Sequence, residues 1–388
     1  MFHIATQEEI KRGKVTDVYF ERTVEILKTC GIEKKVKAEV YAKNLPRDWN
    51  YGVLAGVEEV IKLLEGLPID VNILPEGSIF WKNQPIMQIS GKYTDFAIFE
   101  TPLLGLLCQS SGIATAASRC KIAAKDKTLL SFGARRMHPG IAPMIDRSAF
   151  IGGCDGVAVV KSAQIIGEEA KGTMPHSLIL ILENPIEAYK LFHKIEPLPI
   201  KRIALIDTFG DEKFEAIEAA KTLGEDLFAV RLDTPISRRG DFKAILEEVR
   251  WELDLRGFDE VKLFVSGGLN EFEILRLSNV ADAFGVGTYL SNAPVIDFSL
   301  DIVEINGKPL AKRGKKSGHK KVLQCKKCHK LLILPEKKEV DKCECNGELL
   351  LCLKKLIKKG KITENLPSPQ KIRNYVINQI KDLNLKVE

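Results

Sequence analysis

Four cysteines late in the chain have a spacing that suits a metal ion. They form a C-x2-C pair and, 14 residues further on, a C-x-C pair: Cys325, Cys328, Cys343 and Cys345. Two close pairs of thiolates suit a tetrahedral zinc ion, and four protein ligands leave no position open for a substrate. We therefore predict a structural zinc site. His329 or Cys352 is an alternative for one ligand, because C-x-C pairs are less common than C-x2-C pairs.

Two glycine-rich segments in the middle of the chain could bind an oxyanion. They are Ser266-Gly267-Gly268 and, about 20 residues later, Gly285-Val286-Gly287-Thr288. Glycine allows the backbone to approach an anion closely, and the last two strand ends of α/β barrels frequently hold a phosphate through backbone N–H groups. The two segments therefore predict a split phosphate cradle. The Gly-x-Gly-x-x-Gly fingerprint of dinucleotide-binding folds is absent.

Charged and aromatic residues that suit a substrate site lie in four further segments. His176 belongs to the turn Gly172-Thr173-Met174-Pro175-His176-Ser177, where on its own it could be a hydrogen-bonded core residue. The other segments are Thr16-Asp17-Val18-Tyr19-Phe20, Ser131–Pro139 and Arg231-Leu232-Asp233-Thr234. Arginine offers a planar fork of donors that suits a carboxylate or a phosphate. These companions favour a functional role for His176.

The elements expected to position these residues are alternating strands and helices. Short apolar runs recur, each followed by a Gly- or Asp-rich turn: 129–133, 157–160, 203–207, 229–233, 263–267 and 283–287. Continuous apolar runs suit strands buried on both faces, as in parallel sheets. Apolar residues at helical spacing run from Phe242 to Leu253, and Gly257 follows in a capping position. The order predicts βαβ units in a barrel or an open sheet, with the polar strand ends on the active face.

The net charge of the 388-residue chain is +6, but it is unevenly distributed. Residues 312–361 contain 17 Lys and Arg against 5 Asp and Glu, so the basic excess belongs to the C-terminal region. Nucleic-acid binding by the whole surface is therefore not implied. A zinc-ribbon RNA-binding protein on a degenerate barrel is kept as a remote alternative.

The overall composition is ordinary for a soluble globular protein, with 45% hydrophobic and 28% charged residues. No apolar run approaches the roughly 18 residues of a membrane-spanning helix. The N-terminal segment carries acids where a signal peptide needs an apolar stretch, so we predict a cytoplasmic protein with reduced thiols. We expect an N-terminal α/β domain at 1–111, a catalytic α/β barrel at 112–292, a return segment at 293–320 and a zinc-binding module at 321–388.

Together, and in this order, the segments resemble the nicotinate phosphoribosyltransferases of the shorter archaeal type, which carry a C-terminal zinc-knuckle-like module. The resemblance covers essentially the whole chain. It implies a type II phosphoribosyltransferase, with an irregular α/β barrel and an N-terminal α/β sandwich-like domain. The family joins nicotinate to 5-phosphoribosyl 1-diphosphate, giving nicotinate mononucleotide and pyrophosphate in NAD salvage, with coupled ATP hydrolysis and magnesium. It also implies a homodimer with shared active sites, or a larger assembly.

The resemblance implies substrate-binding roles for individual residues. The phosphate cradle would hold the 5-phosphate of the donor: Ser266, Gly267, Gly268, Gly287 and Thr288. Phe132 and Tyr19 match the two aromatic residues that sandwich the pyridine ring, with Tyr19 supplied by the partner subunit. The other predicted substrate-binding residues are Arg135, Thr173, Asp155 and Asp207.

Three residues are expected to take part in the chemistry itself: His176, Arg231 and Asp233. His176 matches the family's phosphorylated histidine, whose added negative charge would change the affinity for the phosphoribosyl donor. Asp233 would stabilise positive charge at the reacting ribose carbon. Structural alternatives are an ion pair between Arg231 and Asp233, a core position for Phe132, a local helix cap for Tyr19, and a turn position for Asp155.

Two related activities compete with nicotinate transfer. A quinolinate phosphoribosyltransferase would need an additional basic cluster for the second carboxylate, and it lacks the ATP-linked histidine. A nicotinamide-using relative differs by one charge on the substrate, which the residues alone do not decide.

Overall fold

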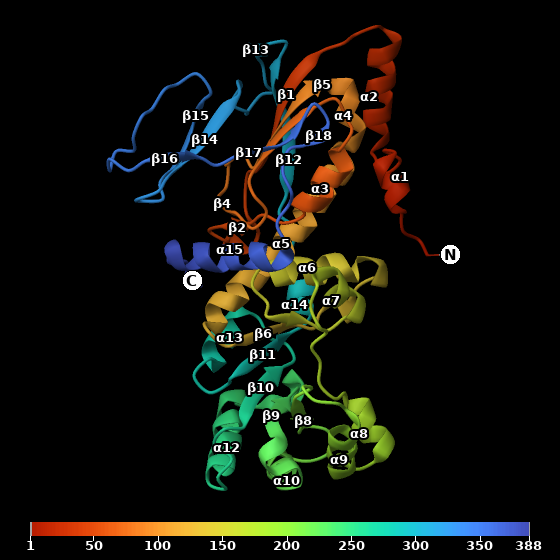
Figure 1. Ribbon diagram of the computed structural model, residues 1–388, viewed down its shortest axis with the longest axis vertical. Helices are drawn as coiled ribbons and strands as arrows, with labels where there is room; N and C mark the ends of the chain where they lie inside the picture. The colour runs from red at the N-terminus through yellow and green to blue at the C-terminus, as the bar shows by residue number, and fades with distance from the viewer. Residues whose placement is uncertain (1, 388) are drawn as a thin grey trace. The chain divides into compact units, whose positions relative to one another are not determined.

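The structure is a computed structural model that describes residues 2–387 and divides into two compact units. One unit combines the described residues up to Thr115 with Pro294–Asn384, and the second combines Ala116–Ala293 with the described residues from Leu385 onward. Each unit is built on a β-sheet of its own (Figure 1).

A seven-stranded antiparallel sheet forms the centre of the first unit. Its order is β13-β12-β1-β5-β3-β17-β18, with the bounds Lys308–Pro309, Phe298–Ile305, Lys35–Ala42, Met87–Lys92, Asp70–Ile73, Lys354–Lys358 and Lys361–Ile362. A small hairpin joins β2 (Gly52–Val53) to β4 (Ile79–Phe80). The accompanying helices are α1 (Gln7–Lys11), α2 (Val18–Thr29), α3 (Val57–Leu64), α4 (Tyr93–Phe96) and the first part of α5 (Glu100–Ala124), which continues into the second unit after Thr115. Apolar residues of the sheet, α3 and the start of α5 share one core.

The cysteine-rich segment forms a separate three-stranded sheet, β15-β14-β16, within the first unit. Its strands are Leu331–Pro335, Lys320–Cys325 and Leu349–Leu351. The chain then returns to the large sheet, where Lys354 of β17 pairs with Ile73 of β3. Helix α15 (Pro369–Asp382) ends the unit, and the Gln379 side-chain amide donates to the Gly77 carbonyl oxygen at 2.8 Å. The segment 321–388 is therefore divided between the small sheet, the large sheet and a helix.

Six parallel strands form the sheet of the second unit, in the order β7-β6-β11-β10-β9-β8. Their bounds are Gly156–Val157, Thr128–Ser131, Ala283–Val286, Lys262–Ser266, Leu227–Leu232 and Arg202–Leu205. Each of the six expected apolar runs overlaps one of these strands. Among the described residues the edge strands β7 and β8 do not pair with each other, so the predicted irregular α/β barrel is confirmed as an open half-barrel.

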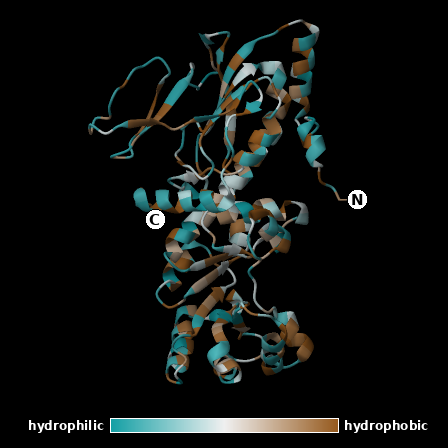
Figure 2. Ribbon diagram, in the orientation of Figure 1, coloured by the Kyte–Doolittle hydropathy of each residue, from teal (hydrophilic) through white to brown (hydrophobic). Residues whose placement is uncertain are grey.

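Helices follow the parallel strands and cover the sheet (Figure 1). They are α6 (Ala142–Ile151), α7 (Val160–Ile166), α8 (His176–Leu182), α9 (Pro185–Ile195), α10 (Glu212–Leu223), α11 (Ile236–Arg239), α12 (Phe242–Asp254), α13 (Glu271–Leu277) and α14 (Thr288–Ser291). Helix α12 begins at the expected residue, because the Asp241 carboxylate accepts hydrogen bonds from the N–H groups of Lys243 and Ala244. Its Leu246 and Val249 are buried. Figure 2 shows both hydrophobic (brown) and hydrophilic (teal) residues along this helix.

One helical stretch, residues 93–124, is long and apolar enough to cross a membrane. Charged residues are few along it, although no unbroken run of 18 apolar residues occurs. Of its most apolar part, 56% is buried inside the structure, a property that the core helix of a folded domain shares.

Candidate active site

A cavity of about 620 Å³ opens at the carboxyl ends of the parallel strands. It is lined by the segment 172–177 and by residues that follow β6, β9, β10 and β11. Eleven of the predicted site residues line it: Phe132, Arg135, Thr173, His176, Arg231, Asp233, Ser266, Gly267, Gly268, Gly287 and Thr288. Parallel strands that end at one edge bring these distant segments together.

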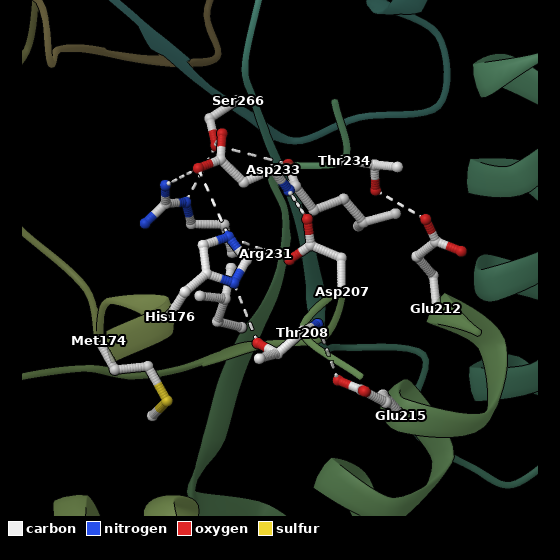
Figure 3. Close-up of polar contacts among 12 residues, drawn as sticks. Met174, His176, Asp207, Thr208, Glu212, Glu215, Arg231, Asp233, Thr234 and Ser266 are labelled. Carbon is white, nitrogen blue, oxygen red and sulfur yellow. Dashed lines mark hydrogen bonds and ion pairs between the residues drawn. The ribbon is translucent and has the colours of Figure 1, made fainter. Parts of the chain in front are cut away.

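Arg231 and Asp233 lie at the centre of a polar network (Figure 3). The Arg231 guanidinium donates to Asp233 Oδ2 at 2.8 Å, to Ser266 Oγ at 3.0 Å and to Thr173 Oγ1 at 2.6 Å. The Ser266 hydroxyl in turn donates to Asp233 Oδ1 at 2.8 Å. The ion pair considered as an alternative does exist, but it lines the cavity, so its polar atoms are placed where a ligand would contact them.

His176 is the first residue of α8 and faces the same network (Figure 3). Its Nδ1 lies 3.0 Å from Thr208 Oγ1. Its Nε2 lies 3.9 Å from Asp207 Oδ1 and 3.9 Å from Asp233 Oδ2. The imidazole is 38% exposed. One ring nitrogen is therefore oriented by a hydroxyl while the other stands between two carboxylates.

Asp207, predicted to bind substrate, is almost fully buried and is absent from the lining of the cavity. Its Oδ2 accepts a hydrogen bond from the Asp233 N–H at 3.0 Å, whereas its Oδ1 has no hydrogen-bond partner among the described residues. Burial raises the pKa of Asp207 to about 6, with the Asp233 charge adding to the effect and the His176 charge opposing it. Burying a carboxylate oxygen without a hydrogen-bond partner costs free energy. A group that binds a ligand is expected to be in this state until the ligand is bound.

The phosphate cradle takes its shape from left-handed glycines. Gly267 and Gly268 have φ angles of +83° and +62°, a region that other residues rarely adopt. A Cβ atom on Gly267 would lie 3.0 Å from Asp233 Oδ1, so a side chain there would press on the network. Neither glycine N–H donates a hydrogen bond within the part of the chain that the structure describes. Both are therefore free to bind an anion.

Phe132 forms one wall of the cavity, directly after β6. Its N–H donates to the Val286 carbonyl oxygen at 2.8 Å, which fixes the backbone at this point. The ring lies so close to Gly285 that a Cβ there would come within 2.5 Å of it. The Arg231 guanidinium carbon is 5.5 Å from the ring centroid. Arg135, exposed in the short helix Ala134–Arg136, adds a second cation to the lining.

Asp155 does not line the cavity, contrary to the prediction for it. It precedes β7, and its Oδ2 accepts hydrogen bonds from Lys121 Nζ at 2.9 Å and from the Leu129 N–H at 2.8 Å. These contacts place the carboxylate at the amino ends of the strands, opposite the active face. The structure supports the alternative of a structural turn residue.

Tyr19 belongs to the first unit and is absent from the lining of this cavity. It lies in α2, is 57% exposed, and its hydroxyl donates to Asp17 Oδ2 at 3.1 Å. Its stacking role, expected from a partner subunit, stays a prediction.

Two acidic residues at this site escaped the sequence analysis. Asp146 of α6 is buried in the cavity lining, and its Oδ1 accepts a hydrogen bond from the Ser131 hydroxyl at 3.0 Å. Burial raises its pKa. Glu215 of α10 accepts hydrogen bonds from the N–H groups of Phe209 and Gly210 at 2.9 and 2.6 Å, and so holds the loop that carries Thr208. Both lie inside helices, where no motif distinguishes them from surface acids.

The four predicted cysteine ligands come together in the small sheet. Their sulfur atoms all lie within 4.8 Å of one another, and the closest pairs are Cys325 with Cys345 at 3.5 Å and Cys328 with Cys343 at 3.6 Å. A Cβ atom on Gly347 would lie 2.5 Å from the Cys325 sulfur, so the loop closes tightly around the cluster. The four sulfurs fit a zinc ion, which would cross-link the two turns. His329 and Cys352 are outside the cluster.

Comparisons with known proteins match most of the chain. The models of the N-terminal and C-terminal domains of quinolinate phosphoribosyl transferase match residues 17–111 and 113–301. A solved structure of a nicotinate-nucleotide pyrophosphorylase from Pyrococcus furiosus is 55% identical, with a TM-score of 0.98 over 100% of this chain and 99% of that one.

More distant relatives carry a related name. A nicotinate phosphoribosyltransferase of Mycobacterium tuberculosis is 28% identical over 307 residues, which cover 69% of this chain and 65% of that protein. The chain thus spans just under two thirds of the length of that relative. The structure of human nicotinic acid phosphoribosyltransferase has a TM-score of 0.74 at 18% identity, covers 94% of this chain and 93% of that one, and shows the shared fold.

Proposed function

The chain belongs to the quinolinate phosphoribosyltransferase family, and from this membership we propose that it joins nicotinate to 5-phosphoribosyl 1-diphosphate in NAD salvage. The products would be nicotinate mononucleotide and pyrophosphate. One observation carries the proposal: a single cavity combines the Arg231–Asp233–Ser266 network with two glycine N–H groups that have no partner among the described residues. Such a cavity suits a ribose that carries phosphate at one end.

The donor would be held by its charged groups. Ser266, Gly267 and Gly268 would bind the 5-phosphate on one side, and Gly287 and Thr288 on the other. The Asp233 carboxylate would face the ribose, where it stabilises the positive charge that develops as the bond to pyrophosphate breaks. Arg231 holds Asp233 in position and balances its charge.

Nicotinate would stack on Phe132, with its carboxylate near Arg135. The ring nitrogen has a lone pair and forms the new bond to the ribose carbon as pyrophosphate leaves with the electron pair of the broken bond. No side chain has to remove a proton. Orientation of the two substrates is therefore the main contribution of the cavity. Tyr19 of a second subunit in a homodimer would close the other face of the ring.

His176 is the residue that would link the reaction to ATP. If its Nδ1 donates to Thr208, Nε2 keeps its lone pair and can accept the γ-phosphoryl group of ATP, releasing ADP. Phosphohistidine beside Asp207 and Asp233 would raise the negative charge of the site until it is hydrolysed.

Carboxylate oxygens suit magnesium, and Asp207 and Asp233 would hold the ion, which neutralises phosphate charge when it is bound.

A direct assay tests the proposal. Purified protein is incubated with 5-phosphoribosyl 1-diphosphate and magnesium, with or without ATP, and with nicotinate, nicotinamide or quinolinate in parallel. Chromatography then follows the mononucleotide. We expect product from nicotinate and a faster reaction with ATP. No product from any of the three substrates would overturn the enzyme assignment.

Quinolinate is the second candidate substrate, because the matching domain models carry its name. Arg135 and the adjacent Arg136 both line the cavity and could bind two carboxylates. Formation of mononucleotide from quinolinate, together with release of carbon dioxide, would decide for this activity. Product from nicotinamide alone would instead show that the cavity selects a neutral ring substituent.

We also propose that the cysteine cluster holds a structural zinc ion. The cluster and the cavity lie in different units, so the ion would act on folding and not on the transfer reaction. Metal analysis of the purified protein tests this directly, with one zinc per chain as the expected result.

A further inference from the structure

Arg239, the last residue of α11, is a buried arginine that the proposed reaction does not use. Its Nε donates to the Thr234 carbonyl oxygen at 2.6 Å, and its Nη2 donates to the Ser266 carbonyl oxygen at 3.1 Å and to that of Gly267. Its guanidinium carbon lies 4.3 Å from the centroid of the Phe242 ring. One side chain therefore ties together the two loops that follow β9 and β10.

These contacts determine which way the cradle faces. In a trans peptide the C=O and the N–H of one peptide unit point in opposite directions. The Ser266 carbonyl shares its peptide unit with the Gly267 N–H, and the Gly267 carbonyl shares its unit with the Gly268 N–H. Because Arg239 draws both carbonyl oxygens to itself, the two N–H groups point away from it. Ser266, Gly267 and Gly268 line the cavity, whereas Arg239 does not.

The charge of Arg239 is also directed at the cradle. Among the described residues, no carboxylate lies within ion-pair distance of its guanidinium, and its hydrogen bonds go to backbone carbonyls. The carboxylates of Glu273 and Asp233 act on its charge from a longer distance, and a buried cation favours an anion in its neighbourhood. Both the geometry and the charge of the residue therefore act on an anion that it does not touch.

The unit with the parallel sheet contains a second buried arginine that can be compared with Arg239, at the amino ends of the strands. Arg202 begins β8, is 6% exposed against 7% for Arg239, and also donates to three backbone carbonyls, those of His193, Glu196 and Ile200. These carbonyls belong to the end of α9 and the turn that follows it, and none of the three residues lines the cavity. Arg202 therefore serves as a control: like Arg239 it holds backbone segments together, but it does not contact the phosphate cradle.

We propose that Arg239 is a positioning residue for the phosphoribosyl donor, which holds the Ser266 and Gly267 carbonyls back so that the N–H groups of Gly267 and Gly268 bind the 5-phosphate. This inference rests on the proposed function.

The test compares Arg239→Met and Arg239→Lys with Arg202→Met and Arg202→Lys in the full chain. We expect Arg239→Met to raise KM for 5-phosphoribosyl 1-diphosphate by about 10- to 100-fold, the loss typical of a misplaced charge-assisted contact. KM for nicotinate should change by less than about twofold, because the pyridine site is built from other residues. Arg239→Lys keeps the charge without the fork and should fall between wild type and Arg239→Met.

The Arg202 variants should lower the melting temperature without changing either KM. If Arg239→Met lowers the melting temperature to the same extent as Arg202→Met and leaves KM for the donor within twofold of wild type, Arg239 is only structural and the proposal is wrong. If Arg239→Met is insoluble, Arg239→Lys alone decides by the same comparison.

A second measurement separates this proposal from the proposed function. Calorimetry with inorganic phosphate, on wild type and both Arg239 variants, measures the cradle without any assumption about the acceptor. If wild type makes no mononucleotide but binds phosphate, and Arg239→Lys binds it at least tenfold more weakly, the transferase is wrong and the role of Arg239 stands. Equal phosphate affinity in wild type and the variants, or no binding to wild type, would overturn the role of Arg239.

Discussion

The six parallel strands use buried polar groups in opposite ways at their amino ends, here called the amino edge of the sheet, and at their carboxyl ends, the carboxyl edge. At the amino edge, Asp155 accepts hydrogen bonds from Lys121 and the Leu129 N–H, and Asp282 accepts one from the Leu263 N–H. At the carboxyl edge, Asp207 Oδ1 and Ser291 Oγ are buried without a hydrogen-bond partner among the described residues. The same residue types therefore stabilise the fold at one edge and are left for a ligand at the other.

The difference follows from what each edge has to do. A satisfied buried carboxylate contributes its hydrogen bonds to stability, whereas an unsatisfied one costs free energy in the empty protein. That cost is recovered only when a ligand supplies the missing partner. The carboxyl edge is thus the destabilised part of a sheet that the amino edge helps to hold together.

The largest expected effect comes from replacing an aspartate by asparagine at the carboxyl edge, and the same replacement at the amino edge is its control. Asp233→Asn removes the negative charge that faces the ribose, so we expect the rate of mononucleotide formation to fall by at least about 100-fold. Asp155→Asn is the matched control, which should lower the melting temperature and leave the rate within twofold of wild type. Equal activity losses in the two variants would show that the edges do not differ as we describe.

The histidines of the unit offer the next comparison. His176→Ala should keep nicotinate-dependent product formation but lose its stimulation by ATP, which we expect to be about tenfold or less, since one phosphoryl group changes the local charge by about two. His193 of α9, whose Nδ1 accepts a hydrogen bond from Arg202, lies away from the cavity. His193→Ala should keep the stimulation. ADP release, measured beside mononucleotide, checks both variants.

Retained ATP stimulation in His176→Ala would place the coupling on another group. Loss of the stimulation in both variants would point to a general loss of structure.

How much of this site the sequence reveals depends on where each residue lies relative to its strand. Arg231, Ser266 and Gly287 stand at or directly after the end of an apolar run, so their place on the active face could be predicted. Asp155 also adjoins an apolar run, but it precedes the run, and β7 has only the two residues Gly156–Val157. A strand that short does not show in the sequence which of its ends carries the polar group.

Other features depend on contacts between distant parts of the chain. The pairing of β17 with β3 joins Lys354 to Ile73, and no local pattern announces such a partner. Asp146 and Arg239 gain their roles only from what packs against them, Ser131 in one case and the Ser266–Gly267 carbonyls in the other. Spacing predicted the cysteine cluster well, because its ligands lie in two short turns.

The cysteine cluster extends the comparison to a third kind of polar group, one that a metal ion would satisfy and of which only Cys325 and Cys343 are buried. Removal of zinc with a chelator, or Cys328→Ser, should lower the melting temperature by about 5 °C or more, because the small sheet has little core of its own. Transfer activity at 25 °C should stay within about twofold of wild type. Thermal unfolding and the mononucleotide assay on the same samples check both statements. Loss of activity without a change in melting temperature would contradict a structural role.

The smallest expected effect is a pH dependence of stability that belongs to Asp207. Its pKa is raised to about 6 in the folded protein, from 3.8 for the free side chain, so between these values the folded state binds more protons than the unfolded state. Stability from this group therefore falls as pH rises through 6 and is regained as pH falls toward 4. Relative to Asp207→Asn, wild type should gain roughly 1 kcal/mol between pH 7 and pH 5.

Urea unfolding of the two proteins at both pH values measures that gain, and Asp155→Asn serves as the control from the amino edge. Asp155 has its hydrogen bonds in place, so its removal should not reproduce the rise in stability toward pH 5. If wild type and Asp207→Asn differ in their free energy of unfolding by the same amount at pH 7 and pH 5, the charged carboxylate of Asp207 does not destabilise the folded protein. The unsatisfied oxygen at the carboxyl edge would then be no different from its satisfied counterparts.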